Sequence, residues 1–258
     1  MSDMKTDFCF SVLALSSKYQ ILAKSLAKGL EEYAHDIPIV IGTDNPSFFK
    51  DCPNVSAFYL EKQGILHCYH DKRFVIQEAL KISETVIQLD ADTQIIESVP
   101  NFLAPGPGLI GIFIDNAVEH MTKYTPERLF HFQKLADKLN VDLSQINFVG
   151  ESLFSVSASY ELGSEFIKQW DLIARYLQLH GIHAGEGNAM GMAAAKVGLE
   201  VKKSPWLESL NRVRQHVNAS ERQSKHSSFQ QLRRRFDYHH RLNRARISAL
   251  KDYEFYYR

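Results

Sequence analysis

Two aspartates one residue apart, Asp90 and Asp92, are the side chains whose type and spacing point most directly to chemistry. They follow the short apolar run 85–89, which predicts a buried parallel strand because both of its faces are apolar and it is too short for a helix. In an open α/β sheet, ligands bind beyond the carboxyl ends of the strands. Two carboxylates that converge there repel each other unless a cation holds them, and Mg²⁺ and Mn²⁺ accept oxygen ligands from carboxylates and phosphates. The stretch therefore predicts a metal site that grips a nucleoside diphosphate. The alternative is a polar turn, since aspartate is favoured in turns.

The composition is that of an ordinary globular protein. The chain has 258 residues, of which 45% are hydrophobic and 23% charged, enough for one large domain or two small ones. Its three cysteines, Cys9, Cys52 and Cys68, form no Cys-x-x-Cys pair and favour a reducing compartment. No apolar run approaches the roughly 20 residues that span a bilayer, and acidic residues precede the early apolar run where a signal peptide would be basic. We therefore predict a cytoplasmic protein.

The net charge of zero hides an uneven distribution. Residues 202–258 contain 14 Lys or Arg against 5 Asp or Glu, which leaves 16 against 25 in residues 1–201. This pattern predicts an acidic body with a basic tail. The arginine-rich, helix-compatible segment 230–246 could contact an anionic partner such as a membrane surface, which would make the protein peripheral to a membrane. It could also fold over a bound pyrophosphate or pack on the acidic body. Nucleic acid is disfavoured because no recognition motif accompanies the charge.

Strand and helix patterns alternate along the body, as in a βαβ fold with a mostly parallel sheet. Runs rich in β-branched and apolar residues predict strands, and apolar residues at helical spacing predict helices. The predicted strands are 8–15, 37–41, 55–60, 85–89, 108–114, 148–156 and 199–201. The predicted helices are 18–33, 71–82, 125–139, 159–180 and 189–197, and flanking prolines predict a rigid loop over 100–107.

This order of features resembles the GT-A class of nucleotide-sugar glycosyltransferases. The similarity lies in a lysine-bearing helix, Lys72-Arg-Phe-Val-Ile-Gln-Glu-Ala-Leu80, that leads into the strand and aspartates Val86-Ile-Gln-Leu-Asp-Ala-Asp-Thr93. The later segments 148–156 and Gly185-Glu-Gly-Asn188 resemble the acceptor-side strand and the acidic loop of that class. The resemblance extends over roughly residues 8–206, and its one specific motif is Asp-x-Asp.

The resemblance implies a fold and an activity. The fold would be a single GT-A-like, Rossmann-like three-layer α/β domain over residues 1–206 with a mostly parallel central sheet. A basic helical extension would follow over 207–258. The activity would be metal-dependent transfer of a sugar from a nucleoside-diphosphate sugar to a hydroxyl acceptor, which could be a glycan, a lipid or a small molecule.

The same resemblance implies roles for particular residues. Asp92 would be a direct ligand of Mn²⁺ or Mg²⁺, and Asp90 would bind the ribose or share the metal. Lys72 is a candidate for donor contact, with a solvated lysine at the start of a helix as its alternative. The backbone around Leu13 to Ser16, which includes Ala14, would border the nucleoside together with Thr43 and Asp44. Many members take a third metal ligand from a histidine near the carboxyl end, and the candidates here are His216, His226, His239 and His240.

Carboxylates later in the chain are candidates for catalysis. Glu186 is our first choice for the group that takes the acceptor's proton or flanks the sugar, because the glycines on both sides let the backbone approach a ligand. The alternative is an acid favoured at a helix N-terminus by the helix dipole. Glu151, predicted in the middle of a strand, is the second choice, with a hydrogen-bonded structural acid as its alternative. Asp115 and His183 are candidates for binding acceptor hydroxyls, and a turn residue and an unengaged loop histidine are their alternatives.

Two rival functions remain open. A nucleotidyltransferase of similar fold would also use aspartates and a metal, but such enzymes usually carry a glycine-rich basic signature after the first strand, which Leu13-Ala-Leu-Ser-Ser-Lys18 lacks. A non-catalytic module that binds a nucleotide or a glycan is the rival from another class. Release of product would separate it from an enzyme.

Overall fold

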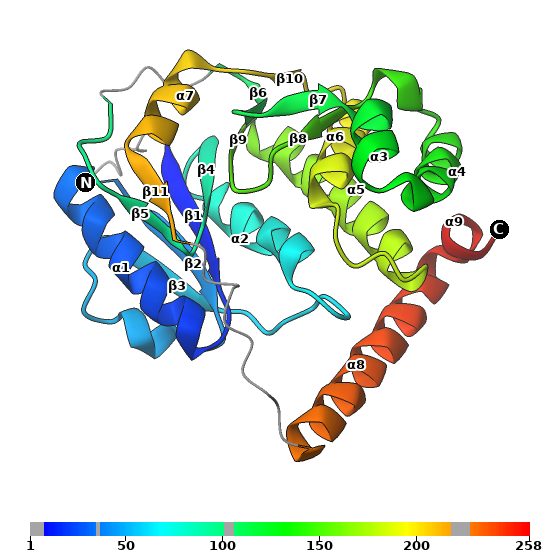
Figure 1. The fold of residues 1–258 in the computed structure, drawn as a ribbon, viewed down its shortest axis with the longest axis horizontal. Coiled ribbons are helices and arrows are strands. Elements are labelled where there is room, and N and C mark those ends of the chain that lie inside the picture. The colour runs from blue at the N-terminus through cyan, green and yellow to red at the C-terminus, as the bar shows by residue number, and fades with distance from the viewer. Residues whose placement is uncertain (1–7, 35–36, 101–105, 218–227) are drawn as a thin grey trace.

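The computed structural model describes residues 8–34, 37–100, 106–217 and 228–258, with side chains in the last range from residue 231. Its centre is a seven-stranded sheet in the order β10-β6-β9-β4-β1-β2-β3 (Figure 1). Every neighbouring pair is parallel except those of β9, which runs antiparallel to both β4 and β6. The strands are β1 Cys9–Ala14, β2 Ile39–Thr43, β3 Val55–Tyr59, β4 Thr85–Asp90, β6 Gly108–Gly111, β9 Leu153–Ser157 and β10 Val201–Lys202. The prediction of an α/β fold with a mostly parallel central sheet is confirmed.

Helices cover both faces of the sheet and make three layers (Figure 1). Successive strand side chains alternate between the faces, so Phe10 and Ile87 join one apolar core while Cys9 and Val86 join the other. The first core is covered by α1 (Ser17–Tyr33) and α7 (Pro205–Arg212). The second is covered by α2 (Lys72–Ala79), α4 (Leu129–Leu139), α5 (Tyr160–Leu179) and α6 (Glu186–Val197). The two cores hold the carboxyl ends of β1 and β4 in place.

The two strands predicted over 108–114 and 148–156 are each divided in the structure. β6 ends at Gly111, where an added Cβ would lie 2.9 Å from Val149 Cγ1, and the chain then turns into β7 (Ile114–Asn116). β7 pairs with β8 (Asn147–Val149), and Gly150 N donates to Phe113 O at 2.8 Å. The prediction that Glu151 lies in the middle of a strand is therefore wrong, because the chain bends between β8 and β9.

A helix that we did not predict, α3 (Ala117–Tyr124), follows β7. Asn116 caps it, because its Oδ1 accepts hydrogen bonds from Val118 N at 2.9 Å and Glu119 N at 3.2 Å. Another prediction started one turn late, since α6 begins at Glu186 and not at residue 189. The predicted rigid loop 100–107 falls mostly outside the described residues.

Residues beyond 206 return to the body. Leu207 and Leu210 are buried in the first core, and β11 (Arg214–His216) pairs antiparallel with β5 (Thr93–Ile95). This pairing lays the chain after α7 alongside the residues that follow Asp92. The division of the chain at residue 206 stays a prediction.

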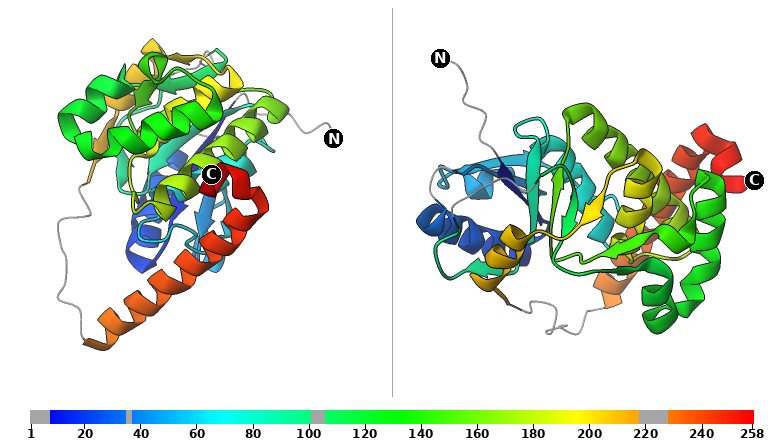
Figure 2. Two further views of the ribbon diagram at one scale, coloured as in Figure 1. Left: turned by 90° about the vertical axis from the view of Figure 1, so that its right-hand side faces the viewer. Right: turned by 90° about the horizontal axis from the view of Figure 1, so that it is seen from above.

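The last helices, α8 (Ser228–Ala249) and α9 (Tyr253–Tyr257), lie on the outside of the body. Ala249 and Tyr256 are buried against the second core. The N-terminal end of α8 extends beyond the rest of the protein (Figure 2, left). Within the described residues, none of the helices has the length and apolar character needed to cross a membrane.

Candidate active site

A cavity of about 560 Å³ opens at the carboxyl ends of β1 and β4. The register of the two strands sets Leu13 beside Asp90, so the β1–α1 turn and the two aspartates border the same space. The cavity is lined by Leu13, Leu15, Tyr19, Cys68, Tyr69, Lys72, Gln88, Asp90, Ala91, Asp92, Glu151, Ser152, Ala184, Glu186 and His216. Residues from six separate stretches of the chain thus meet at the edge where the sequence predicts a ligand site.

Lys72, the first residue of α2, is the central cation of this cavity. Its Nζ lies 2.8 Å from Asp90 Oδ1 and 3.8 Å from Glu186 Oε1, and it donates to Glu151 O at 2.9 Å. Burial by itself would lower the pKa of Lys72, but the charges of Asp90 and Glu186 outweigh burial and raise it. The ammonium group therefore stays charged in the cavity, beside the first aspartate of the motif.

Glu151 and Glu186 form a buried pair of carboxyl groups on the other side of Lys72. Glu151 Oε1 accepts a hydrogen bond from Gly187 N at 2.8 Å, and Glu186 is only 3% exposed. Burial and the neighbouring charge of Glu186 raise the pKa of Glu151 to about 8. One of the two groups accordingly holds a proton near neutral pH, because two buried carboxylates this close cannot both ionise freely. Glu186 Oε2 makes no hydrogen bond to any described residue and remains able to accept one.

His216 is brought to the second aspartate by the β5–β11 pairing. That pairing sets His216 opposite Thr93 and leaves its Nδ1 3.6 Å from Asp92 Oδ1. Val217 N also donates to Asp92 O at 2.7 Å, which fixes the returning chain against the motif. Of the other tail histidines proposed as ligands, His226 lies outside the described residues, and the cavity lining contains no residue of α8.

The donor atoms at this edge suit a divalent cation. Asp90, Asp92 and His216 offer carboxylate oxygens and an imidazole nitrogen, which Mn²⁺ accepts. In the described part of the chain, no three His, Cys, Asp or Glu side chains are already gathered closely enough to enclose a metal ion. Asp90 instead bonds Lys72. The donor set fits an ion that keeps several positions for phosphate oxygens, and it does not fit a closed structural site.

The predicted nucleoside-side residues lie at two places. Leu13 lines the cavity, whereas Ala14, Thr43 and Asp44 lie outside its lining. Asp44 Oδ1 accepts hydrogen bonds from Ser16 N at 3.0 Å and from a side-chain donor of α1, Gln20 Nε2, at 2.6 Å. Its contact is therefore with the β1–α1 turn, which it holds in place.

The predicted acceptor-side residues do not line the main cavity. Asp115 lies on β7, where its Oδ1 accepts from Asn116 N at 2.9 Å. His183 lines a second cavity of about 400 Å³ that also includes His67, Arg128 and His180. Ala184 lines both cavities, so they adjoin at the loop before Glu186.

Several lining residues were not predicted. Tyr69 stacks on His67 with ring centroids 4.9 Å apart, and Gln88 Oε1 on β4 accepts a hydrogen bond at 2.7 Å from Ser11 Oγ on the neighbouring strand β1. A polar Gln88 in an otherwise apolar buried strand is a signal that the sequence did contain. Tyr69 carries no such signal, because its place depends on the turn before α2.

Comparisons with known proteins bear on the fold. No protein-family model and no curated protein sequence matches the chain. The solved structure of the galactosyltransferase LgtC with donor and acceptor sugar analogues superposes with a TM-score of 0.51 at 11% identity, covering 89% of this chain and 94% of that one. Two other solved structures were found at lower TM-scores. The apo bifunctional glycosyltransferase WbbM has a TM-score of 0.48 and 12% identity over 80% of this chain, which spans 40% of WbbM. Apo mouse xyloside xylosyltransferase 1 has a TM-score of 0.44 and 11% identity over 84% of this chain and all of that one. Together with the sheet order, the likeness to LgtC shows that this chain has a GT-A-like glycosyltransferase fold.

Proposed function

We propose that this protein is a metal-dependent glycosyltransferase that moves a sugar from a nucleoside-diphosphate sugar to a hydroxyl acceptor. One observation carries the proposal. A single cavity holds Asp90, Asp92 and His216 at one side, Lys72 in the middle, and the carboxyl pair Glu151 and Glu186 at the other. A site for an anionic leaving group and a site for proton transfer thus face each other.

The diphosphate would lie at the aspartate side. Asp92 and His216, with Asp90, would hold Mn²⁺ or Mg²⁺, which when bound neutralises charge that develops on the leaving diphosphate. Lys72 would add a fixed positive charge there, since burial and its carboxylate neighbours keep it protonated. Leu13 and the turn that Asp44 holds would border the nucleoside.

Proton transfer would take place at the carboxyl pair. We assign Glu186 to accept the proton of the acceptor hydroxyl in an inverting reaction, or to flank the sugar in a retaining one. Its buried Oε2 without a hydrogen-bond partner supports this choice. Glu151 would hold a proton near neutral pH, because its pKa is raised, and it anchors the start of α6 through Gly187.

The acceptor would approach through the second cavity. That cavity adjoins the first at Ala184, next to His183, whose pKa is lowered by burial and by His67. A neutral imidazole can donate to or accept from a sugar hydroxyl. We therefore keep His183 as an acceptor-binding residue and leave out Asp115, which lines neither of these two cavities.

The proposal is tested first by thermal unfolding of the protein with nucleoside diphosphates and nucleotide sugars, with and without Mn²⁺. An assay with nucleotide sugars and hydroxyl acceptors then measures the nucleoside diphosphate that is released. Asp92→Asn is compared with Asp115→Asn, a matched change outside the cavity. We expect one nucleotide to raise the melting temperature only with Mn²⁺, in the wild type and Asp115→Asn but not in Asp92→Asn. Failure of every nucleotide would overturn the proposal. Binding without release or transfer would identify a binding module. Release of pyrophosphate in a separate assay with a nucleoside triphosphate and a sugar 1-phosphate would identify a nucleotidyltransferase.

A further inference from the structure

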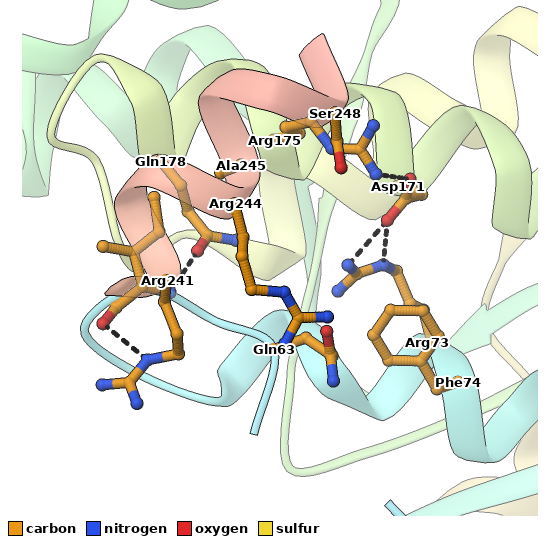
Figure 3. A pocket seen from close by; sticks show the side chains of 11 residues that line it. Gln63, Arg73, Phe74, Asp171, Arg175, Gln178, Arg241, Arg244, Ala245 and Ser248 are labelled. Atoms are coloured by element: carbon orange, nitrogen blue, oxygen red, sulfur yellow. Dashed lines mark hydrogen bonds and ion pairs between the residues drawn. The ribbon is translucent and has the colours of Figure 1, made fainter. Parts of the chain in front are cut away.

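A third, smaller cavity of about 100 Å³ lies between α8 and the body, and four arginines line it (Figure 3). Arg73 of α2 and Arg175 of α5 come from the body, and Arg241 and Arg244 come from α8. This cavity is separate from the active site, although the two sites touch consecutive residues of α2. Lys72 lines the active site, whereas the next side chain, Arg73, lines the cavity under α8.

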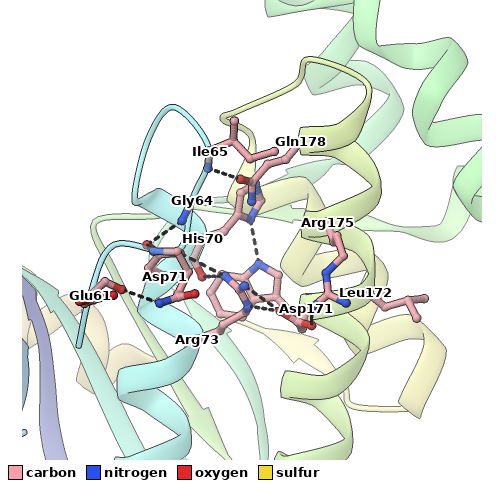
Figure 4. A network of polar contacts seen from close by, with 12 residues as sticks. Glu61, Gly64, Ile65, His70, Asp71, Arg73, Asp171, Leu172, Arg175 and Gln178 are labelled. Atoms are coloured by element: carbon pink, nitrogen blue, oxygen red, sulfur yellow. Dashed lines mark hydrogen bonds and ion pairs between the residues drawn. The ribbon is translucent and has the colours of Figure 1, made fainter. Parts of the chain in front are cut away.

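On the body side of the cavity, the acid in the lining is already paired with arginines of the body. Asp171 is the single carboxylate among the described residues that line it. Its Oδ1 accepts from Arg73 Nε at 3.0 Å and Nη2 at 2.7 Å, and its Oδ2 accepts from Arg175 Nη2 at 2.7 Å (Figure 4). Both oxygens are therefore occupied before α8 adds its charges.

The α8 side brings two more guanidinium groups and no acid to the lining. Arg241 Nε donates to the carbonyl oxygen of Ile65 at 3.2 Å. This oxygen carries no formal charge, so it does not neutralise the guanidinium group. Arg244 is exposed to solvent and reaches across the cavity toward Gln63 (Figure 3). Burial lowers the pKa of nearby Lys62, and the charge of Arg241 lowers it further, while Asp71 acts in the opposite direction.

Asp171 pairs with Arg73 and Arg175, and the buried Asp71 adds a second ion pair, with its Oδ1 3.5 Å from Arg73 Nη1. Arg241 and Arg244 make no ion pair with an acid among the described residues, so the contact carries excess positive charge that an anion would balance. The buried apolar anchors of the tail, Ala249 and Tyr256, lie at its far end and do not balance that charge.

Guanidinium groups bind phosphate oxygens through paired hydrogen bonds and lose less hydration than ammonium groups. The cavity volume is several times the roughly 30 Å³ of a water molecule and far below that of the active site.

We propose that this cavity is an anion site that takes one phosphate group, held between Arg241 and Arg244 of α8 and Arg73 and Arg175 of the body. The bound phosphate fastens α8 to α2 and α5. The phosphate comes either from a free phosphate or from the headgroup of an acidic lipid, since both present the same oxygens to the arginines. This site goes beyond the proposed transferase activity and does not depend on it.

The test is titration calorimetry of inorganic phosphate into the full chain, without divalent metal and at constant ionic strength. Arg244→Gln is compared with Arg246→Gln, an exposed arginine two residues away on the same helix that does not line the cavity. We expect the wild type and Arg246→Gln to bind phosphate alike and Arg244→Gln to bind it at least about tenfold more weakly. Equal affinity in all three proteins, or no binding to the wild type, would overturn the proposal. Binding at the active site would give that equal result, because neither variant touches it.

Sedimentation with vesicles identifies the source of the phosphate. Vesicles of phosphatidylcholine with phosphatidic acid are compared with vesicles of phosphatidylcholine alone. If Arg246→Gln sediments with the acidic vesicles and Arg244→Gln does not, the site takes a lipid headgroup. If the two variants sediment alike while their phosphate affinities differ, the site takes a soluble phosphate. Both results support the site.

Discussion

His216 lies with its Nδ1 3.6 Å from Asp92 Oδ1, although 123 residues separate them in the chain. The contact depends on β11, which pairs with β5 directly after the aspartate motif. A histidine from the returning chain and a carboxylate from the central sheet thus border one cavity.

If His216 and Asp92 share a cation, removing the imidazole should weaken the binding of that cation. We expect His216→Ala to bind Mn²⁺ at least about tenfold more weakly in the presence of the stabilising nucleotide, because one of few protein ligands is lost. Electron paramagnetic resonance of free Mn²⁺ measures this affinity. His240→Ala, on exposed α8, is the control and should bind as the wild type does. The assignment is wrong if both variants bind Mn²⁺ with wild-type affinity. In a separate measurement, chelation of the metal with EDTA should abolish the rise in melting temperature that the nucleotide causes.

Glu186 should be needed for turnover and not for the helix it begins. We expect Glu186→Gln to lower kcat by about 10²–10⁴-fold, because the amide cannot take a proton from the acceptor. Glu161→Gln is the matched control, since Glu161 also lies in the first turn of a helix, α5, but is exposed to solvent. Equal losses of melting temperature with no loss of kcat in either variant would favour the helix-dipole role instead.

The raised pKa of Glu151 predicts how stability changes with pH. Its pKa is about 8 in the folded protein, whereas an exposed glutamate has an ordinary pKa of 4.5. Between these two pH values the folded state holds a proton that the unfolded state has lost. Stability from this group is therefore full below pH 4.5 and falls as pH rises to about 8, by an amount on the order of a few kcal/mol. Urea unfolding from pH 5 to pH 9 should show a shallower decline in Glu151→Gln than in the wild type. Parallel pH profiles would contradict the raised pKa.

Gly187 has no room for a side chain. An added Cβ would press against the ring of Phe148 and the carbonyl oxygen of Val149. The carbonyl oxygen belongs to the backbone, so it cannot rotate away as a side chain could. We expect Gly187→Ala to destabilise the protein by about 1–3 kcal/mol, because the start of α6 must shift. It should also lower activity, since Gly187 N holds Glu151. Thermal unfolding measures the stability change. Gly106→Ala, where the nearest atom is Lys202 Nζ at 3.9 Å, should change stability little, and similar losses in both would refute this explanation.

Features with local causes were readable from the sequence. The apolar run before Asp90 predicted a buried strand, and β4 is that strand, with the aspartates at its carboxyl end. The helical spacing over 18–33 predicted α1, because apolar residues at that spacing form one stripe that can pack on the core. Such patterns depend on residues only a few positions apart, so they can be recognised in the sequence itself.

Features set by distant contacts were not readable. The strands predicted over 108–114 and 148–156 divide because the backbones near Gly111 and Gly150 approach each other. A glycine inside each run was a local sign of a break, but only the fold decides which segment approaches it. The same limit explains why α3 was missed, since its cap Asn116 also resembles a turn residue.

The sequence by itself determined the α/β class, the strand that presents Asp90 and Asp92, and the basic character of the tail. Tertiary structure alone decided which tail histidine meets the motif, because the register of β11 on β5 selects His216. It also decided that Lys72 and Arg73, adjacent in sequence, line different cavities. The physical reason is the same in each case: strand register and helix docking are fixed by packing between segments far apart in the chain, and that packing exists only once the chain has folded.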